Sequence, residues 1–205
     1  MTDPGGRISA TERRLSGTFD ERSAGDKLAS VMARTVGAKR VLIVDPLDGE
    51  STAHAVRAVG PRGRVVTLVA TESAAETVRA SLDDDLASRV DLMVGEPLTT
   101  LARIRADDDS LFGVIDLHLR RIARDGPVDA GAQYVEWALV LGRPGTVLIA
   151  DGVVGDGAVD TDGPAGDTLR TMLTLVAAHP RLDGTAVQTV GVHGRDGLLL
   201  AVVTD

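Results

Sequence analysis

The chain has 205 residues, of which 43% are hydrophobic, so it can bury a full core and is not intrinsically disordered. Its net charge of −8 argues against nucleic acid and anionic membranes as partners, and no apolar run reaches the ~20 residues of a membrane span. It has no cysteine, which excludes disulfides and cysteine-based metal sites, and its first residues lack the apolar core of a signal peptide, so we expect a cytoplasmic protein.

Strands and helices are predicted to alternate along most of the chain. Residues 1–18 are polar, and we expect a loose arm there, followed by a single domain over residues 19–205. A helical spacing of apolar residues begins at Ala24. The strands predicted after it are 40–44, 64–70, 89–94, 112–119 and 146–150, and the helices lie near 51–59, 72–82, 97–105, 131–142 and 164–178. This alternation predicts βαβ units and a parallel sheet with helices on both faces.

The end of the chain has a different pattern. GTAVQTV at 184–190 and LLLAVV at 198–203 predict two strands, joined by a glycine-rich hairpin. With the five strands before them, they predict an α/β fold with a seven-stranded, mostly parallel sheet in which one strand of the C-terminal hairpin is antiparallel.

The turn after the first predicted strand is unusual. VLIV at 41–44 runs into DPLDGEST at 45–52, where nucleotide-binding α/β proteins place glycines that let the backbone approach an anionic ligand. This turn contains one glycine and three acids, which are Gly49, Asp45, Asp48 and Glu50. Acids also stabilise the start of a helix through its dipole whatever the function, so they do not by themselves indicate a ligand.

Several segments of residues 25–205 occur in an order and spacing found in a known protein family. They are GAKRVL at 37–42, GEST at 49–52, GRVVTL at 63–68, YVEWAL at 134–139, RPGTVLIAD at 143–151 and the final HPRLDGTAV and DGLLLAVV. In this order the chain resembles the class I S-adenosylmethionine-dependent O-methyltransferases of the catechol and caffeoyl-CoA type. The resemblance implies a Rossmann-like methyltransferase sheet and a cofactor site at the first turn.

The resemblance implies four cofactor-binding candidates, Gly49, Ser51, Thr71 and Glu96. Ser51 matches a serine that holds the methionine carboxylate in the family. Val69 stands where the family has an acid for the ribose hydroxyls, and Thr71, two residues later, offers a weaker neutral hydrogen bond. Glu96 lies near the expected adenine, although a helix-start acid is the alternative. We therefore expect S-adenosylmethionine to bind weakly.

The family's magnesium site takes an aspartate at the end of the fourth strand and an Asp-Asn pair after the fifth. Here Asp151 is followed by Gly152, and either Asp116 or His118 could match the fourth-strand aspartate. Two candidate ligands without the third make a poor magnesium site, so we expect no metal. His118 and Asp151 are the catalytic candidates, because a histidine beside a carboxylate can act as a general base. A histidine packed in the core or at its rim is the alternative.

These departures from the family's cofactor and metal residues leave two functions of different classes. The first is a methyltransferase-fold protein in which metal-dependent methyl transfer to small-molecule hydroxyls has lapsed, a pseudoenzyme that binds a small molecule or a protein partner. The alternative is an active, metal-independent S-adenosylmethionine-dependent O-methyltransferase with a rearranged cofactor site. Tyr134 and Trp137 are the only Tyr and Trp and lie on one predicted helix; they either pack on the sheet or contribute to a homodimer, which the resemblance suggests.

Overall fold

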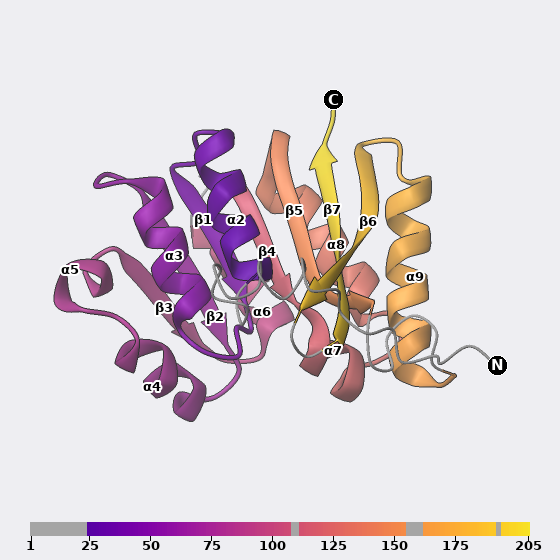
Figure 1. Cartoon of the computed structure of the whole chain (residues 1–205), viewed down its shortest axis with the longest axis horizontal. Helices are drawn as coiled ribbons and strands as arrows, with labels where there is room; N and C mark the ends of the chain where they lie inside the picture. Colours follow the sequence, from indigo (N-terminus) through magenta and orange to yellow (C-terminus); the bar gives the residue numbers. More distant parts are fainter. Residues whose placement is uncertain (1–23, 108–110, 155–161, 192–193) are drawn as a thin grey trace, which may run out of the picture.

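Seven strands form one sheet in the computed structural model, which describes residues 24–107, 111–154, 162–191 and 194–205 (Figure 1). The spatial order is β3-β2-β1-β4-β5-β7-β6. The strands are β1 (Arg40–Val44), β2 (Arg64–Val69), β3 (Val90–Val94), β4 (Phe112–His118), β5 (Gly142–Val154), β6 (Leu182–Gly191) and β7 (Gly194–Val203). Only β7 runs antiparallel to its neighbours, β5 and β6, within the described residues. The predicted seven-stranded fold is confirmed.

Helices cover both faces of this sheet, as Figure 1 shows. They are α2 (Ala24–Thr35), α3 (Glu50–Val59), α4 (Glu72–Ala80), α5 (Asp84–Ala87), α6 (Pro97–Asp107), α7 (Leu119–Asp125), α8 (Ala130–Leu141) and α9 (Pro164–Ala178). One face packs against α2 and α3, and the other packs against α6, α7, α8 and α9. Among the described residues, no helix has the length and apolarity to cross a membrane.

The central strands are apolar at nearly every position because both of their faces are covered. In β1, Val41 and Ile43 face the layer of α2 and α3, whereas Leu42 and Val44 face the layer of α6 to α9. Alternate strand residues point to opposite faces, so a strand buried on both sides has to be apolar throughout. This explains why the sequence shows an unbroken VLIV rather than an alternation of apolar and polar residues.

Three features differ from the sequence prediction. The short helix α5 was not predicted; Asp83 caps it by accepting a hydrogen bond from the Leu86 amide. Helix α7 was not predicted either, because it begins directly after β4 with no Gly or Pro turn between them. The strand expected at 146–150 is the middle of the longer β5. The arm expected at residues 1–18 lies outside the described residues.

The two aromatic residues of α8 belong to the core. Tyr134 is buried, and Trp137 is partly buried and packed against the same cluster. Both therefore pack on the sheet, which is the first of the two alternatives for them. The homodimer does not depend on these side chains and stays a prediction.

The core position of β5 gives a test of the fold. Leu148 is 0% exposed and Leu47 is 66% exposed, so the two leucines form a matched pair. We expect Leu148→Ala to lower the free energy of unfolding by about 2–5 kcal/mol. Leu47→Ala should change it by less than about 0.5 kcal/mol. Urea denaturation measures both, and losses of similar size would contradict the placement of Leu148.

Candidate functional site

The two catalytic candidates, His118 and Asp151, meet at the carboxyl ends of two central strands. In the register of β4 and β5, His118 lies directly opposite Asp151, and Ile43 of β1 lies opposite Asp116. Open α/β sheets bind their ligands at this edge. The register places His118, and not Asp116, opposite Asp151.

The His118 ring lies between two carboxylates. Its Nδ1 is 3.1 Å from Asp151 Oδ2, and its Nε2 is 3.5 Å from Asp116 Oδ2. Asp116 shares a face of β4 with His118, because residues two apart on a strand point the same way. The side chains of His118 and Asp116 are almost completely buried, so water screens their interaction little.

This arrangement shifts the pKa values of His118 and Asp151 in opposite directions. Burial alone would lower the pKa of His118, but Asp116 and then Asp151 outweigh it and hold the pKa well above 6.5. Burial would raise the pKa of Asp151, but His118, the Leu119 amide and Arg120 hold it below its usual value. The two carboxylates therefore favour the protonated form of the His118 ring. A protonated ring would have to lose its proton before it could act as a general base.

The residues present do not fit a magnesium ion. Both oxygens of Asp151 are engaged, since Oδ1 accepts a hydrogen bond of 3.0 Å from the Leu119 amide and Oδ2 faces His118. Gly152 contributes no side-chain oxygen. Its φ is +69°, and a Cβ there would lie 3.0 Å from Arg120 Cγ. Within the described part of the chain, no group of three or more His, Asp or Glu side chains is arranged to hold a metal.

The unusual turn after β1 is held by an ion pair. Asp45 is buried with a φ of +58°, a left-handed conformation that glycine adopts more easily. Its Oδ2 accepts from Nε of Arg121 on α7 at 2.5 Å. The turn therefore keeps a backbone shape typical of glycine while carrying a charged side chain. Sequence reasoning missed Arg121, because α7 itself was not predicted.

The first two cofactor candidates lie at the start of α3 and differ in what holds them. Gly49 precedes the helix, and a Cβ there would lie 2.4 Å from Ser81 Cβ at the end of α4. Packing against α4 is thus enough to require glycine at this position. Ser51 is buried, and its Oγ has no hydrogen-bond partner among the described residues. A buried hydroxyl without a partner costs free energy, so Ser51 is suited to bind a polar group of a ligand.

The other two cofactor candidates cap helices. Thr71 Oγ1 accepts from the Ala74 amide at 3.2 Å at the start of α4. The Glu96 carboxylate accepts from the amides of Leu98 and Thr99, at 3.2 and 2.7 Å, at the start of α6. Burial tends to raise the pKa of Glu96, and these amide contacts lower it, with a net lowering. For Glu96 this is the helix-start role given above as the alternative.

Tyr134 joins the same region, although its sequence context indicated only packing. Burial raises the pKa of its phenol, and the charges of Glu96 and Asp45 raise it further, while Arg121 opposes them. The phenol thus lies within electrostatic reach of the β1 turn and of the end of β3. The polar site at this edge includes Arg121 and Tyr134, two residues that were not among the sequence candidates.

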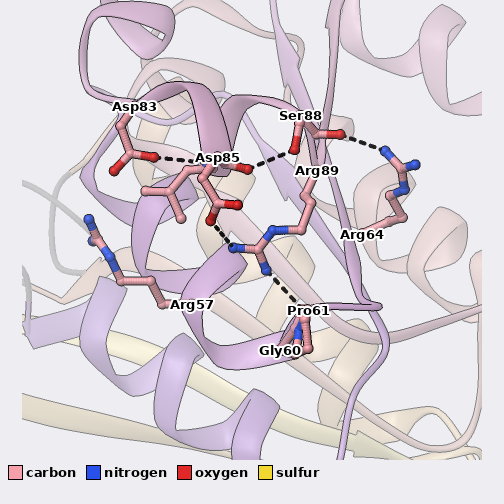
Figure 2. A pocket seen from close by; sticks show the side chains of 9 residues that line it. Arg57, Gly60, Pro61, Arg64, Asp83, Asp85, Ser88 and Arg89 are labelled. Carbon is pink, nitrogen blue, oxygen red and sulfur yellow. Dashed lines mark hydrogen bonds and ion pairs between the residues drawn. The ribbon is translucent and has the colours of Figure 1, made fainter.

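A hollow lies at the opposite edge of the sheet, where β2 and β3 begin (Figure 2). Its volume is about 650 Å³, and its lining residues are Arg57, Gly60, Pro61, Arg64, Asp83, Asp85, Leu86, Ser88 and Arg89. Arg89 Nη1 donates to the carbonyls of Val56 and Gly60 and so caps the end of α3. Arg64 donates to the Ser88 carbonyl. These guanidinium groups support the ends of α3 and α5, and this structural role accounts for the presence of Arg64 and Arg89 in the lining without a ligand.

Comparison with proteins of known sequence finds two catechol O-methyltransferases, although no protein-family profile matches the chain. The protein from Mycobacterium tuberculosis is 36% identical over 180 residues, covering 86% of this chain and 77% of that protein. The protein from Niastella koreensis is 30% identical, covering 86% of this chain and 79% of that one.

Solved structures give the same result. An O-methyltransferase from Bacillus cereus in complex with S-adenosylhomocysteine superposes with a TM-score of 0.78 at 32% identity, covering 94% of this chain and 88% of that one. The O-methyltransferase TomG from Streptomyces achromogenes, solved with S-adenosylmethionine, gives a TM-score of 0.81 at 28% identity and covers 100% of both chains.

The position of His118 predicts how stability depends on pH. Its pKa is higher in the folded chain than the value of about 6.5 expected when unfolded, so its contribution is complete below pH 6.5 and is lost as the pH rises through the folded-state pKa. We expect the free energy of unfolding to fall in that alkaline window by at most about 1.4 kcal/mol per pH unit. Urea denaturation from about pH 6 to pH 10 measures this slope.

The variant His118→Gln isolates this contribution from other groups that titrate at high pH. The difference in slope between wild type and variant is the quantity to compare. His179→Gln, a change outside the site, should keep the wild-type slope. If His118→Gln also kept it, the ring would not be the group that titrates.

Proposed function

Because the chain belongs to the class I S-adenosylmethionine-dependent O-methyltransferase family, we propose that it is a member in which metal-dependent methyl transfer has lapsed and which acts by binding a small molecule or a protein partner. One observation carries the proposal: four of the five polar candidate side chains are used in contacts within the chain, and Ser51 is the exception. The four are His118, Asp151, Thr71 and Glu96.

Methyl transfer to a hydroxyl needs a group that removes the hydroxyl proton. The candidates at the strand ends are poor proton acceptors, since Asp116 and Asp151 raise the pKa of His118 and so favour its protonated form, and the pKa of Asp151 is lowered. Arg120 acts electrostatically on Asp151 and Arg121 is paired with Asp45, and a guanidinium does not release its proton at neutral pH. This supports a lapse of the chemistry rather than a change of base.

The residues at the expected cofactor position support weak ligand binding. Ser51 would hold the carboxylate of a bound S-adenosylmethionine, which would supply an electrophilic methyl group. Val69 offers no charge-assisted hydrogen bond to the ribose, and Asp45 carries a side chain where the backbone would have to approach closely. Ser51 is thus the one candidate that keeps a polar contact for a cofactor, a buried hydroxyl without a partner in the described part of the chain.

The alternative is an active, metal-independent O-methyltransferase. It requires the cofactor site to be rebuilt from other residues, and Arg121, which is paired with Asp45, and Tyr134 lie near the β1 turn. The affinity for the cofactor separates the two functions, because an active enzyme must bind it at a useful concentration.

We expect S-adenosylmethionine to bind with a dissociation constant near or above ~1 mM. Calorimetry with S-adenosylmethionine and S-adenosylhomocysteine measures this, and Ser51→Ala should weaken any binding that remains. Restoring the family pattern with Val69→Glu, Asp45→Gly and Leu47→Gly should tighten it. Val69 is completely buried, so a glutamate there costs stability, and the Asp45→Gly, Leu47→Gly double variant is measured as well.

The result of this titration decides between the two functions. Weak binding by the unmodified chain together with a gain in the variants supports the proposed lapse. Micromolar binding by the unmodified chain would contradict it and favour the active enzyme. Light scattering at high micromolar concentration tests the homodimer separately, and a monomer would rule it out.

A further inference from the structure

We propose that the ring of His118 occupies the space between Asp116 and Asp151 where a shared divalent cation would have to lie, and that it thereby keeps such ions from binding to these two carboxylates. The inference deepens the proposed lapse of metal-dependent transfer and rests on it. It assigns the loss to one side chain of this chain, in addition to the missing donor at Gly152.

The first argument is geometric. Asp116 Oδ2 and Asp151 Oδ2 lie on opposite sides of the imidazole, at 3.5 Å from Nε2 and 3.1 Å from Nδ1. A magnesium ion binds its ligand oxygens at about 2.0–2.1 Å and a calcium ion at about 2.3–2.6 Å. One ion cannot come this close to both carboxylates while the ring separates them. The ring would have to move out from between the two carboxylates before an ion could bind to both of them.

Packing keeps the ring where it is. The His118 side chain is 7% exposed, and His118 pairs with Asp151 in the register of β4 and β5. A rotation that frees both carboxylates would therefore take the ring out of two ion pairs and out of a buried site.

Charge acts in the same direction. Asp151 lies within electrostatic reach of Arg120 as well as of His118, so two cationic side chains already surround it. An arriving divalent ion would be repelled by both and would also have to give up part of its hydration shell. Two carboxylates that are already paired inside the chain do not compensate for these costs.

The experiment uses the full chain and Mn²⁺ as the probe, with free Mn²⁺ measured by electron paramagnetic resonance. We expect no binding by the wild type at millimolar Mn²⁺. His118→Ala removes the ring and leaves the two carboxylates without their partner, so it should bind Mn²⁺ at least tenfold more tightly than the wild type. Adding Asp116→Asn to His118→Ala should abolish this gain.

Controls keep the outcome specific. His179→Ala removes a histidine outside the site and should leave the wild-type result unchanged. If His118→Ala does not fold, His118→Asn, which is smaller and neutral but can still hydrogen-bond, takes its place. Wild-type binding at micromolar Mn²⁺ that Asp151→Asn abolishes would overturn the inference. So would a folded His118 variant that binds no Mn²⁺, because the ring would then not be the obstacle.

The two proposals can fail separately. Micromolar binding of S-adenosylmethionine by a wild type that binds no Mn²⁺ would contradict the proposed function and leave this inference standing. Tight Mn²⁺ binding by the wild type with weak cofactor binding would overturn only the inference.

Discussion

The ion pairs of His118 with Asp116 and Asp151 set the chemistry of this edge of the sheet. The strand register places Asp151 opposite His118, two residues after Asp116 on the same face of β4, and a buried carboxylate is costly unless a positive or hydrogen-bonding partner compensates it. A bound metal ion is one way to supply the positive charge, and a histidine between the carboxylates is another. His118 supplies this charge here. Its contacts with Asp116 and Asp151 therefore account for its own raised pKa, the lowered pKa of Asp151 and the poor fit to magnesium.

The fold could be predicted well because its signal is local and repeated. An apolar run such as VLIV, followed by a turn and a helical spacing, occurs often enough to give the number of strands and their mostly parallel arrangement. The elements that were missed lacked such signals. Helix α5 is a single turn, and α7 follows β4 without a break residue, so only tertiary packing determines where β4 ends and α7 begins.

The site could be predicted only where the strand ends determine it. His118 and Asp151 were expected at adjacent strand ends, and the 3.1 Å contact confirms that they meet. The partnership of Asp45 with Arg121 joins residues 76 positions apart, and it depends on the direction in which α7 leaves the sheet. Which polar residues cap helices and which remain available, as Ser51 does, also follows from packing. No spacing in the sequence separates Thr71 from Ser51 in this respect.

The turn after β1 shows how a ligand site can lose its ligand residues and keep its shape. A non-glycine residue in a left-handed conformation costs of order 1–3 kcal/mol, least for Asp and Asn, and an ion pair with Arg121 offsets part of that cost for Asp45. The shape is also required by the fold, because α3 has to start where Gly49 packs against Ser81 at the end of α4. The backbone of this turn is thus constrained by its neighbours even without a cofactor. Resemblance in this segment therefore indicates the fold, and the function has to be argued from the side chains that the turn presents.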